Sequence, residues 1–234
     1  MRVHVIQLSY GDGESLPDRA DRVAALVRAQ SGADLVVLPE LWPNGGFAYD
    51  TWQAGAQQLD GHVVTELRAA ARDLGATVHM GSFVERDEAG RLFNTSVLLG
   101  ATGELLTTYR KVHLFGFGEG EPALMTPGDR PVVYETLGLA TCYDLRFPEM
   151  FRALLDAGAE IVLMPAAWPA KRVHHWRLLA QARAVENQSY VVACNTGGTH
   201  AGVPMGGHSL VVDLDPAYVA KTRAAFPVLA DRRL

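Results

Sequence analysis

Residues 137–149 read LGLATCYDLRFPE, a short apolar run followed directly by polar residues around a cysteine. The apolar run at residues 137–140 predicts a buried strand. Cys142 therefore stands at the terminus of that strand, which is where α/β proteins place functional residues. The position alone leaves two interpretations of Cys142 open: a nucleophile, or a buried thiol that only fills the core.

Two further apolar runs lead to a residue that complements a thiol. The run ADLVV (33–37) continues through LPE to Glu40, and GELLTT (103–108) continues through YRK to Lys111. A glutamate can take the proton of a cysteine. An ammonium stabilises a thiolate and, later, a developing oxyanion. A carboxylate, an ammonium and a thiol are therefore sufficient for acyl transfer without a histidine or a metal.

Strand-like and helix-like segments alternate along the chain, which predicts an α/β protein with a mixed sheet covered by helices. The expected strands cover residues 3–8, 35–38, 77–84, 94–99, 105–109, 132–136, 139–142, 161–165, 190–195 and 209–212. The expected helices cover residues 17–30, 63–74, 147–157 and 173–187, and a last helix begins at Pro216 with Asp215 as its N-cap. This pattern is compatible with three layers and with four.

Length and composition bound the class of protein. The chain has 234 residues, of which 48% are hydrophobic, and a net charge of −5. We expect one domain with a large core, no basic patch for nucleic acid and no membrane span. The chain starts directly with a strand-like segment, so we expect no secretory signal and a cytoplasmic protein. Cys142 and Cys194 show neither metal-binding nor redox spacing, and we expect no metal and no cofactor.

Three sequence words, in this order, resemble the Glu-Lys-Cys triad of the nitrilase superfamily of carbon–nitrogen hydrolases. They are VVLPELW with Glu40, YRKVHLF with Lys111 and ATCYDLRFPE with Cys142, separated by 71 and 31 residues. The resemblance extends over nearly the whole chain. It implies that residues 1–234 form a single carbon–nitrogen hydrolase domain, a four-layer α-β-β-α sandwich of the nitrilase type. It also implies a homodimer or higher homo-oligomer, paired through helices near the active site.

The resemblance assigns a role to each member of the triad. Cys142 would be the nucleophile, on a strained turn whose Tyr143 backbone N–H points at the oxyanion. Lys111 would hold the same oxyanion, and Glu40 would act first as general base and then as general acid. The competing interpretations are a solvated loop carboxylate for Glu40 and a surface cation for Lys111.

The glycine-rich segment GFGEGEP (116–122) offers two candidates for a second active-site glutamate. Glu121 lies eight residues before Asp129 of TPGD, as in the nitrilase superfamily, whereas Glu119 competes by its spacing to Lys111. We favour Glu121 and expect it to orient Lys111 or the substrate amide. The segment lacks the strand-to-helix context and the Lys-Ser/Thr pair of a phosphate loop, so we interpret it as a mobile active-site loop.

Two further residues are candidates for substrate binding. Arg146 could bind a substrate carboxylate in a bidentate manner, or it could brace the turn through Glu149 or Asp144. Trp168 in the segment PAAWP could line the pocket, or it could pack into the core. The sequence leaves both alternatives open for each residue.

The segment CYDLRFPE is most similar to the ω-amidase and deaminated-glutathione-amidase branches of the superfamily. This similarity implies hydrolysis of a non-peptide C–N bond in a small carboxylate-bearing amide, through a thioester on Cys142 and with release of ammonia. Nitrile hydrolysis and N-carbamoyl amide hydrolysis are the alternatives within the superfamily. Two alternatives belong to other classes: an inactive member that serves as a binding subunit, and a papain-like hydrolase that pairs Cys142 with His113.

Two junctions are shorter than the superfamily pattern, and neither offers the turn signals that a chain reversal usually needs. They run from Val212 to Leu214 and from Glu135 to Gly138. Each is either a true deletion or a place where residues are missing from the chain. We favour missing residues, which predicts that Cα atoms of adjacent residues there lie further apart than the ~3.8 Å of a bonded pair.

Overall fold

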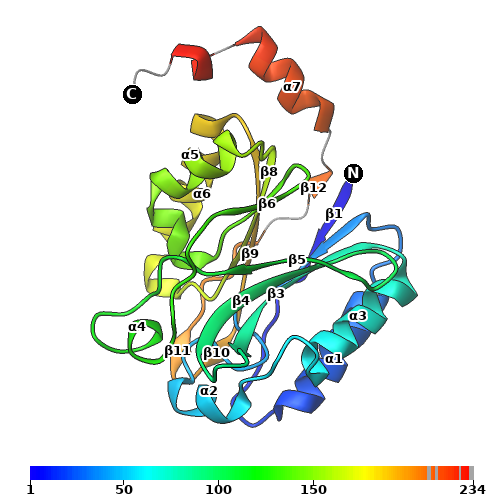
Figure 1. Ribbon diagram of the computed structural model, residues 1–234, viewed down its shortest axis with the longest axis vertical. Helices are drawn as coiled ribbons and strands as arrows, with labels where there is room; N and C mark the ends of the chain where they lie inside the picture. The colour runs from blue at the N-terminus through cyan, green and yellow to red at the C-terminus, as the bar shows by residue number, and fades with distance from the viewer. Residues whose placement is uncertain (210–211, 214–215, 227, 232–234) are drawn as a thin grey trace.

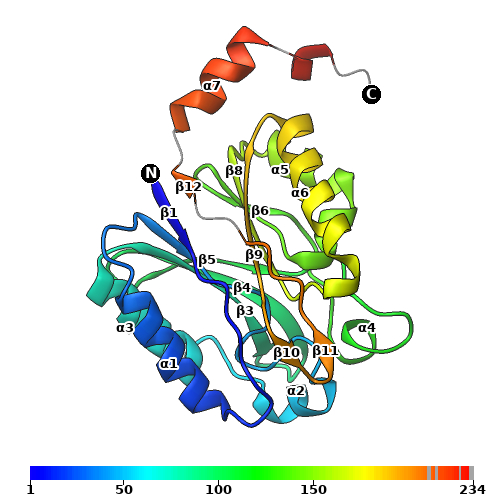
Figure 2. The same cartoon turned by 180° about the vertical axis from the view of Figure 1, so that it is seen from behind.

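Two β-sheets pack face to face, and helices cover the outer face of each sheet (Figures 1 and 2). The computed structural model describes residues 1–209, 212–213, 216–226 and 228–231. The larger sheet contains, in spatial order, β12 (Val212–Asp213), β1 (Arg2–Val5), β2 (Leu35–Val37), β3 (Thr77–Arg86), β4 (Leu92–Leu99) and β5 (Leu105–Arg110). The smaller sheet contains β6 (Val132–Tyr134), β7 (Leu137–Leu139), β8 (Ile161–Ala166) and β9 (Tyr190–Asn195).

The helices complete a four-layer α-β-β-α sandwich, as the resemblance implied. The larger sheet is covered by α1 (Leu16–Arg28) and α3 (His62–Leu74), and the smaller sheet by α5 (Pro148–Asp156) and α6 (Val173–Asn187). The shorter elements are α2 (Tyr49–Gly55), α4 (Glu121–Leu124), α7 (Pro216–Ala225), the 3-10 helices η1 (Cys142–Arg146), η2 (Ala170–Arg172) and η3 (Val228–Asp231), and the hairpin of β10 (Thr199–His200) and β11 (Val203–Pro204). Within the described residues, no helix is long and apolar enough to cross a membrane.

Strand β2 shows how the sequence builds these layers. All three of its residues are buried. Leu35 and Val37 pack into the core between the two sheets, whereas Val36 packs into the core beneath α1 and α3. Successive side chains of a strand point to opposite faces, so a strand with two buried faces must be apolar at every position. This is why the run is continuous rather than alternating.

The main helices begin and end close to their predicted positions because the terminal residues supply the needed geometry. Ser15 precedes α1 and its hydroxyl accepts the N–H of Asp18 at 3.3 Å, while Pro17 stands in the first turn. Gly75 ends α3 in the left-handed conformation, with a φ of 73°. The strand expected at residues 139–142 is β7 (Leu137–Leu139) in the structure, which begins two residues earlier and ends three residues earlier than predicted and so leaves Cys142 outside the sheet.

The prediction of a chain break between Glu135 and Gly138 is wrong. Tyr134 pairs with Leu137 in the β6–β7 hairpin, so a continuous two-residue turn connects the strands. Glu135 has a φ of 53°, a left-handed conformation that hairpin turns of this length require. Glycine, asparagine or aspartate usually occupies such a position, and the sequence signal was absent because a glutamate takes it.

The second short junction reaches Leu214, which lies outside the described residues. The same holds for Asp215, the expected N-cap of the last helix. Before this point, β12 pairs antiparallel with β1, with Val212 opposite Val3. Of the strand expected at residues 209–212, Ser209 is not part of a strand and Val212 begins β12.

Candidate active site

Cys142 is the first residue of η1, in the turn that follows β7. Its φ is 45°, a left-handed conformation that costs a residue with a side chain about 1–2 kcal/mol. Thr141 and Asp144 form a capping box around this turn, in which the Thr141 N–H donates to Asp144 Oδ2 at 2.8 Å. The Tyr109 hydroxyl donates to the same carboxylate oxygen at 2.7 Å. Backbone strain that its surroundings hold in place is typical of active sites.

His113 is bound by the Asp144 carboxylate and is not placed to serve Cys142. The backbone N–H of His113 donates to Asp144 Oδ1 at 3.1 Å, and Nδ1 of the imidazole ring lies 2.7 Å from the same oxygen. The imidazole stacks on the Phe147 ring with the centroids 3.7 Å apart. Among the described residues, those that line the pockets at Cys142 do not include His113. The papain-like alternative therefore has no support in the structure.

Glu40 follows β2 at a second strained turn, because Leu41 has a φ of 45°. A bulge in the neighbouring strand β3 holds this turn. The backbone at Gly81 approaches the Pro39 carbonyl so closely that a Cβ would collide with it, which requires glycine there. The next residue, Ser82, accepts the N–H of Leu41 at 3.0 Å. The backbone turn that carries Glu40 is thus held by β3.

Lys111 connects two carboxylates. Its Nζ lies 2.7 Å from Glu40 Oε1 and 2.8 Å from Glu121 Oε2, and all three side chains are at most 4% exposed. Lys111 directly follows β5, and its N–H donates to the Asn94 carbonyl of β4 at 2.9 Å. An ammonium has three N–H donors. Two of them serve the carboxylates, which leaves one for a further acceptor.

Asn94 and Ala167 complete the binding of Glu40, although the sequence analysis did not single them out. Asn94 Nδ2 donates to Glu40 Oε1 at 2.9 Å and to Glu121 Oε1 at 2.5 Å. The Ala167 N–H donates to Glu40 Oε2 at 2.9 Å. Asn94 is 1% exposed, and an amide within a buried strand must find hydrogen-bond partners, which is a signal that could have indicated it. Ala167 contributes only its backbone and offers no such signal.

The structure places Glu121, and not Glu119, beside Lys111. Glu121 begins α4 at the end of the glycine-rich segment, and its Oε2 also accepts the N–H of Phe115 at 2.5 Å. Glu119 is exposed. The segment expected to be only a loop therefore includes a short helix, which was not predicted because its four residues are too few to show a periodic pattern.

The thiol of Cys142 lies in an environment that keeps it protonated. Burial raises its pKa well above the ordinary value, and the charge of Glu40 and a side-chain hydrogen bond with Glu40 raise it further, while Lys111 lowers it. A carboxylate within hydrogen-bond reach of the thiol is positioned to take its proton. The geometry therefore suits proton transfer from Cys142 to Glu40 during attack, rather than a free thiolate waiting for substrate.

Charges within the cluster keep Lys111 an ammonium. Burial disfavours its charged form, but Glu121 and Glu40 outweigh burial and raise the pKa of Lys111 well above its ordinary value. Burial also raises the pKa of Glu121, which Lys111 opposes and Glu40 reinforces. Lys111 thus remains a positive hydrogen-bond donor in the wall of the pocket.

Two adjoining pockets meet at Cys142 and form one site with two halves. The half lined by Glu40, Lys111 and Glu121 is called the polar half here. The half lined by Arg146 and Arg172 is called the arginine half. The two halves share Phe47, Phe115, Cys142 and Ala167, and the arginine half adds Tyr143, Trp168 and Pro169.

Tyr143 is the second residue of η1, a position whose backbone N–H has no acceptor within the helix. Its ring packs edge-on against Phe115 and against Phe147, with centroids 5.3 and 5.2 Å apart. The Tyr143 backbone N–H lies in the first turn of η1, one residue after Cys142.

Arg146 and Trp168 both line the arginine half. The Arg146 guanidinium lies 4.8 Å from the centre of the Trp168 ring. In the described part of the chain Arg146 makes no ion pair with Asp144 or Glu149, so the structure does not show the bracing alternative. Trp168 is 3% exposed and fits both of its alternatives, because it belongs to the core between the sheets and also lines the pocket.

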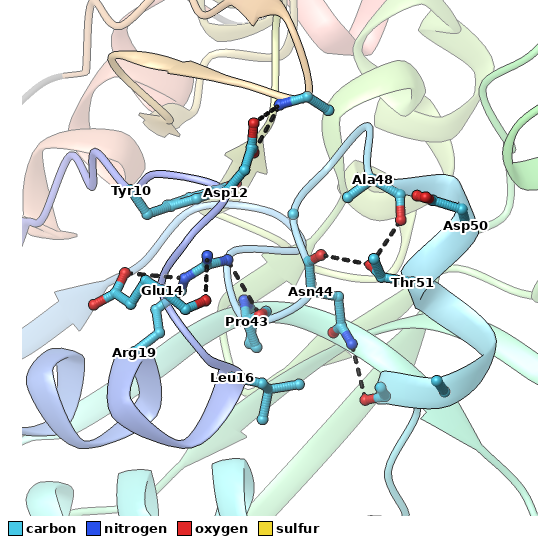
Figure 3. A pocket seen from close by; sticks show the side chains of 14 residues that line it. Tyr10, Asp12, Glu14, Leu16, Arg19, Pro43, Asn44, Ala48, Asp50 and Thr51 are labelled. Carbon is cyan, nitrogen blue, oxygen red and sulfur yellow. Dashed lines mark hydrogen bonds and ion pairs between the residues drawn. The ribbon is translucent and has the colours of Figure 1, made fainter.

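A larger cavity of about 640 Å³ lies elsewhere in the protein (Figure 3). The loop at residues 44–48 separates it from the catalytic cluster, because residues of this loop line both. The polar groups that line it bind one another: Arg19 donates to Glu14 at 3.1 Å, and Asp12 accepts the N–H of Ala201 at 2.8 Å. We place the chemistry at Cys142, because none of the four catalytic candidates lines the larger cavity.

Metal binding has no arrangement to support it within the described residues. No group of three or more His, Cys, Asp and Glu side chains is placed there to hold a metal ion. Both cysteines are free. Where Glu40 and Glu121 converge, the Lys111 ammonium occupies the place that a metal cation would take.

The amino-acid sequence of this chain is similar to those of known proteins. Residues 2–225 match the family model for carbon–nitrogen hydrolases. The chain is 42% identical to 2-oxoglutaramate amidase of Paenarthrobacter nicotinovorans, over 99% of this chain and 89% of that one. It is 34% identical to human deaminated glutathione amidase, over 94% of this chain and 80% of that one. The match to the Paenarthrobacter protein extends over 261 positions, more than the 234 residues here, so that relative carries residues this chain lacks.

Solved structures extend the comparison to the fold. Nit3 of Saccharomyces cerevisiae, a member of branch 10 of the nitrilase superfamily, has a TM-score of 0.88 at 28% identity, over 100% of this chain and 97% of that one. The amidase of Nesterenkonia sp. AN1 has a TM-score of 0.77 at 27% identity, over 98% and 96%. In a glutamate-to-glutamine variant of that amidase, the acetamide moiety of fluoroacetamide is added covalently at the active-site cysteine. The chain described here belongs to the carbon–nitrogen hydrolase family, within the nitrilase superfamily.

Proposed function

We propose that this carbon–nitrogen hydrolase cleaves the amide bond of a small amide that carries a carboxylate at its other end. The products are ammonia and a carboxylic acid. The observation that carries the proposal is the convergence of Glu40, Lys111 and Cys142 on one pocket whose other half ends in arginines. The name of the 2-oxoglutaramate amidase relative supports the same class, since 2-oxoglutaramate has an amide at one end and a carboxylate at the other.

Acylation begins when the Cys142 thiol attacks the amide carbonyl carbon. Glu40 takes the thiol proton as the S–C bond forms, because its carboxylate and the thiol line the same half of the pocket. The carbonyl oxygen becomes an oxyanion. Glu40 then returns the proton to the amide nitrogen, the C–N bond breaks, and ammonia leaves while a thioester remains on Cys142.

The oxyanion is held by two donors in this account. Lys111 has one N–H left after it serves Glu40 and Glu121, and the Tyr143 backbone N–H stands in the first turn of η1. Donors placed in advance at a developing charge give the largest catalytic effects, since they need no reorganisation during reaction. Glu121 and Asn94 act as positioning residues, because they fix Lys111 and Glu40.

Deacylation uses the same groups in the reverse direction. Glu40 accepts a proton from a water molecule, the resulting hydroxide equivalent attacks the thioester carbon, and Lys111 again holds the oxyanion. The C–S bond breaks, the Cys142 sulfur regains a proton from Glu40, and the carboxylic acid leaves. One carboxylate thus manages every proton of the cycle, which requires that it stay firmly oriented; the hydrogen bonds from Asn94 and Ala167 provide that orientation.

An ammonia-release screen tests the proposed function. Purified protein would be incubated with ω-amides of short dicarboxylic and 2-oxo acids, with nitriles of matched length and with N-carbamoyl amino acids. We expect release from the ω-amides and none from the Cys142→Ala variant. Preferred release from nitriles or carbamoyl compounds would move the activity to the alternatives within the superfamily. No release from any compound would favour an inactive member that serves as a binding subunit.

We also propose that the protein is a cytoplasmic homodimer that pairs through α6. Leu178 and Val185 of α6 are 63% and 78% exposed, and residues seven apart lie on one face of a helix. Two free, buried cysteines and no disulfide suit a reducing compartment. Sedimentation velocity on the wild type and on Leu178→Glu/Val185→Glu would test the dimer. A monomeric wild type would contradict it.

A further inference from the structure

The two halves of the catalytic pocket carry opposite charge. Glu40 and Glu121 stand in the polar half, where they outnumber the single cation Lys111. The arginine half contains Arg146 from η1 and Arg172 from η2, and no aspartate or glutamate lines it. A molecule that reaches from Cys142 into the arginine half therefore moves from a negative to a positive environment.

Neither arginine has a carboxylate partner within the described residues. The Arg146 guanidinium contacts the Trp168 ring and lies 3.5 Å from His175 Nδ1, and Arg172 lies 5.5 Å from the centre of the Phe115 ring. Both side chains are half-buried. Another half-buried arginine, Arg110, is paired bidentately with a glutamate. Two half-buried arginines that share one pocket without an anion are an unusual arrangement, since buried charge is normally paired.

Trp168 contacts both arginines, one through the arginine side chain and the other through the arginine backbone. The Trp168 ring lies beneath the Arg146 guanidinium, and Trp168 Nε1 donates to the Arg172 carbonyl at 2.8 Å. The backbone of Trp168 is in turn fixed by Asn195, whose Oδ1 accepts its N–H at 2.7 Å and whose Nδ2 donates to its carbonyl at 3.2 Å. Trp168 therefore supports the Arg146 guanidinium directly and fixes the backbone of Arg172, which reduces the ordering that ligand binding would require.

The positive charges of the arginine half affect the pKa of the neighbouring His175. Desolvation lowers the pKa of His175, and the charges of His174, Arg146 and Arg172 lower it further. No negative group contributes to that shift. Arg146 and Arg172 thus both act on His175 as positive charges.

We infer that Arg172 binds the carboxylate end of the substrate together with Arg146, and that this pair selects ω-amides without an α-ammonium group. This inference rests on the proposed function and adds a residue and a selection rule to it. Two guanidiniums offer several N–H donors in fixed planes, which suits a carboxylate and an adjacent 2-oxo oxygen.

The same pair of charges disfavours an amino acid amide. An ammonium next to the carboxylate would face two uncompensated guanidiniums, and like charges placed opposite one another weaken binding strongly. The chemical class of substrate is therefore the ω-amide of a 2-oxo or unsubstituted dicarboxylic acid. The corresponding α-amino acids, such as L-glutamine, are excluded.

Kinetics of matched substrates test the inference. We would compare glutaramate with pentanamide, which lacks the carboxylate, and with L-glutamine, which adds the ammonium, in the wild type and in Arg172→Met. We expect the variant to raise KM for glutaramate roughly ten- to hundredfold, the effect of losing a hydrogen bond to a charged group, with little change for pentanamide. The discrimination against L-glutamine should decrease. Equal losses on glutaramate and pentanamide, or no loss on either, would overturn the inference.

Three further variants separate binding from structure. Lys171→Met and Arg177→Met remove the same charge from exposed positions next to Arg172 and on α6, and they should leave KM for glutaramate unchanged. Arg172→Lys keeps the charge without the planar fork, so it should restore part of the affinity lost in Arg172→Met. A glutaramate KM that rises as much in Lys171→Met as in Arg172→Met would show a general charge effect and overturn the specific role.

A binding measurement keeps this inference independent of the proposed function. Glutarate and its neutral diamide would be titrated as protectants of Cys142 against iodoacetamide, with the modified peptide quantified by mass spectrometry. We expect glutarate to protect the wild type far better than the diamide, and Arg172→Met to lose this difference. Protection by glutarate without any amide hydrolysis would support the arginine pair while contradicting the proposed function. Amide hydrolysis without preferential protection by glutarate would support the proposed function and contradict the role of the arginine pair.

Discussion

Lys111 and Glu40 form a buried ion pair in which Nζ lies 2.7 Å from Oε1, and the two side chains are 1% and 4% exposed. Glu121 shares the same ammonium at 2.8 Å. Removing one partner of a buried pair leaves an uncompensated charge and typically costs roughly 3–5 kcal/mol. The catalytic groups therefore depend on one another for folding as well as for chemistry, and variants of this cluster must be judged on both.

The variant Lys111→Met should lose both activity and stability. It removes an oxyanion donor, which typically lowers kcat about 10²- to 10³-fold, and it leaves Glu40 and Glu121 buried without a cation. We expect a loss of roughly 3–5 kcal/mol in the free energy of unfolding, measured by urea denaturation. The double variant Lys111→Met/Glu121→Gln should recover part of that stability and none of the activity. A stable Lys111→Met protein would contradict the role of the ion pair.

The variant Glu40→Gln should separate thiol ionisation from catalysis. Burial is the largest cause of the raised pKa of Cys142, and the Glu40 charge is the next. Removing that charge lowers the thiol pKa, so alkylation by iodoacetamide should reach its half-maximal rate at a lower pH than in the wild type. Amide turnover should nevertheless be lost, because no base remains to move protons. An unchanged or higher alkylation midpoint would show that Glu40 does not act on the thiol.

Asn94 should matter for kcat more than for KM. The variant Asn94→Ala removes the donor shared by Glu40 and Glu121, and hydrogen bonds to charged groups contribute about 1.5–3 kcal/mol, or roughly ten- to hundredfold in rate. Thr95→Val is a matched control, because Thr95 lies next to Asn94 on β4 and the change removes its buried hydrogen bond to Glu85 of β3. Steady-state kinetics should show a kcat loss in Asn94→Ala that Thr95→Val does not share. Equal losses would mean that β4 packing is responsible.

The buried His79 side chain should lower the free energy of unfolding in acid. Desolvation lowers its pKa from 6.5 to about 3, so the unfolded state takes up the proton first. The stability that depends on neutral His79 is complete above the pKa of this histidine in the unfolded state. It is lost as the pH falls towards the pKa of His79 in the folded state, at about 1.4 kcal/mol per pH unit. His79→Asn cannot titrate, so its free energy of unfolding should fall less than that of the wild type between pH 7 and pH 5. Parallel curves for the two proteins would contradict the assignment.

Much of the fold and of the site could be predicted because each signal is local. Glu40, Lys111 and Cys142 each follow an apolar run, so they were recognised as residues at strand ends. The structure brings them together because β2, β5 and β7 end near one another in the two packed sheets. The residues were visible in the sequence, whereas their distances arise from long-range packing.

The residues that were missed have no local signal of that kind. Arg172 stands beside Lys171 in a polar stretch, and only the folded structure shows that it lines the pocket, with its guanidinium 5.5 Å from the centre of the Phe115 ring. Short elements such as α2 are too brief to show a period. Glu135 adopts a turn conformation that its residue type rarely takes, which led to the wrong prediction of a chain break. In each of these cases tertiary contacts decide what local sequence does not.

A thioester on Cys142 is the central claim, and quench mass spectrometry tests it most directly. The wild type would be mixed with excess glutaramate, quenched in acid during turnover, digested and mapped, with Cys142→Ala as the control. The account predicts that the peptide containing Cys142 gains the mass of the acyl group, that this adduct disappears on treatment with hydroxylamine, and that the control releases no ammonia. Continued ammonia release by Cys142→Ala, or an acyl group found on any other residue, would contradict it.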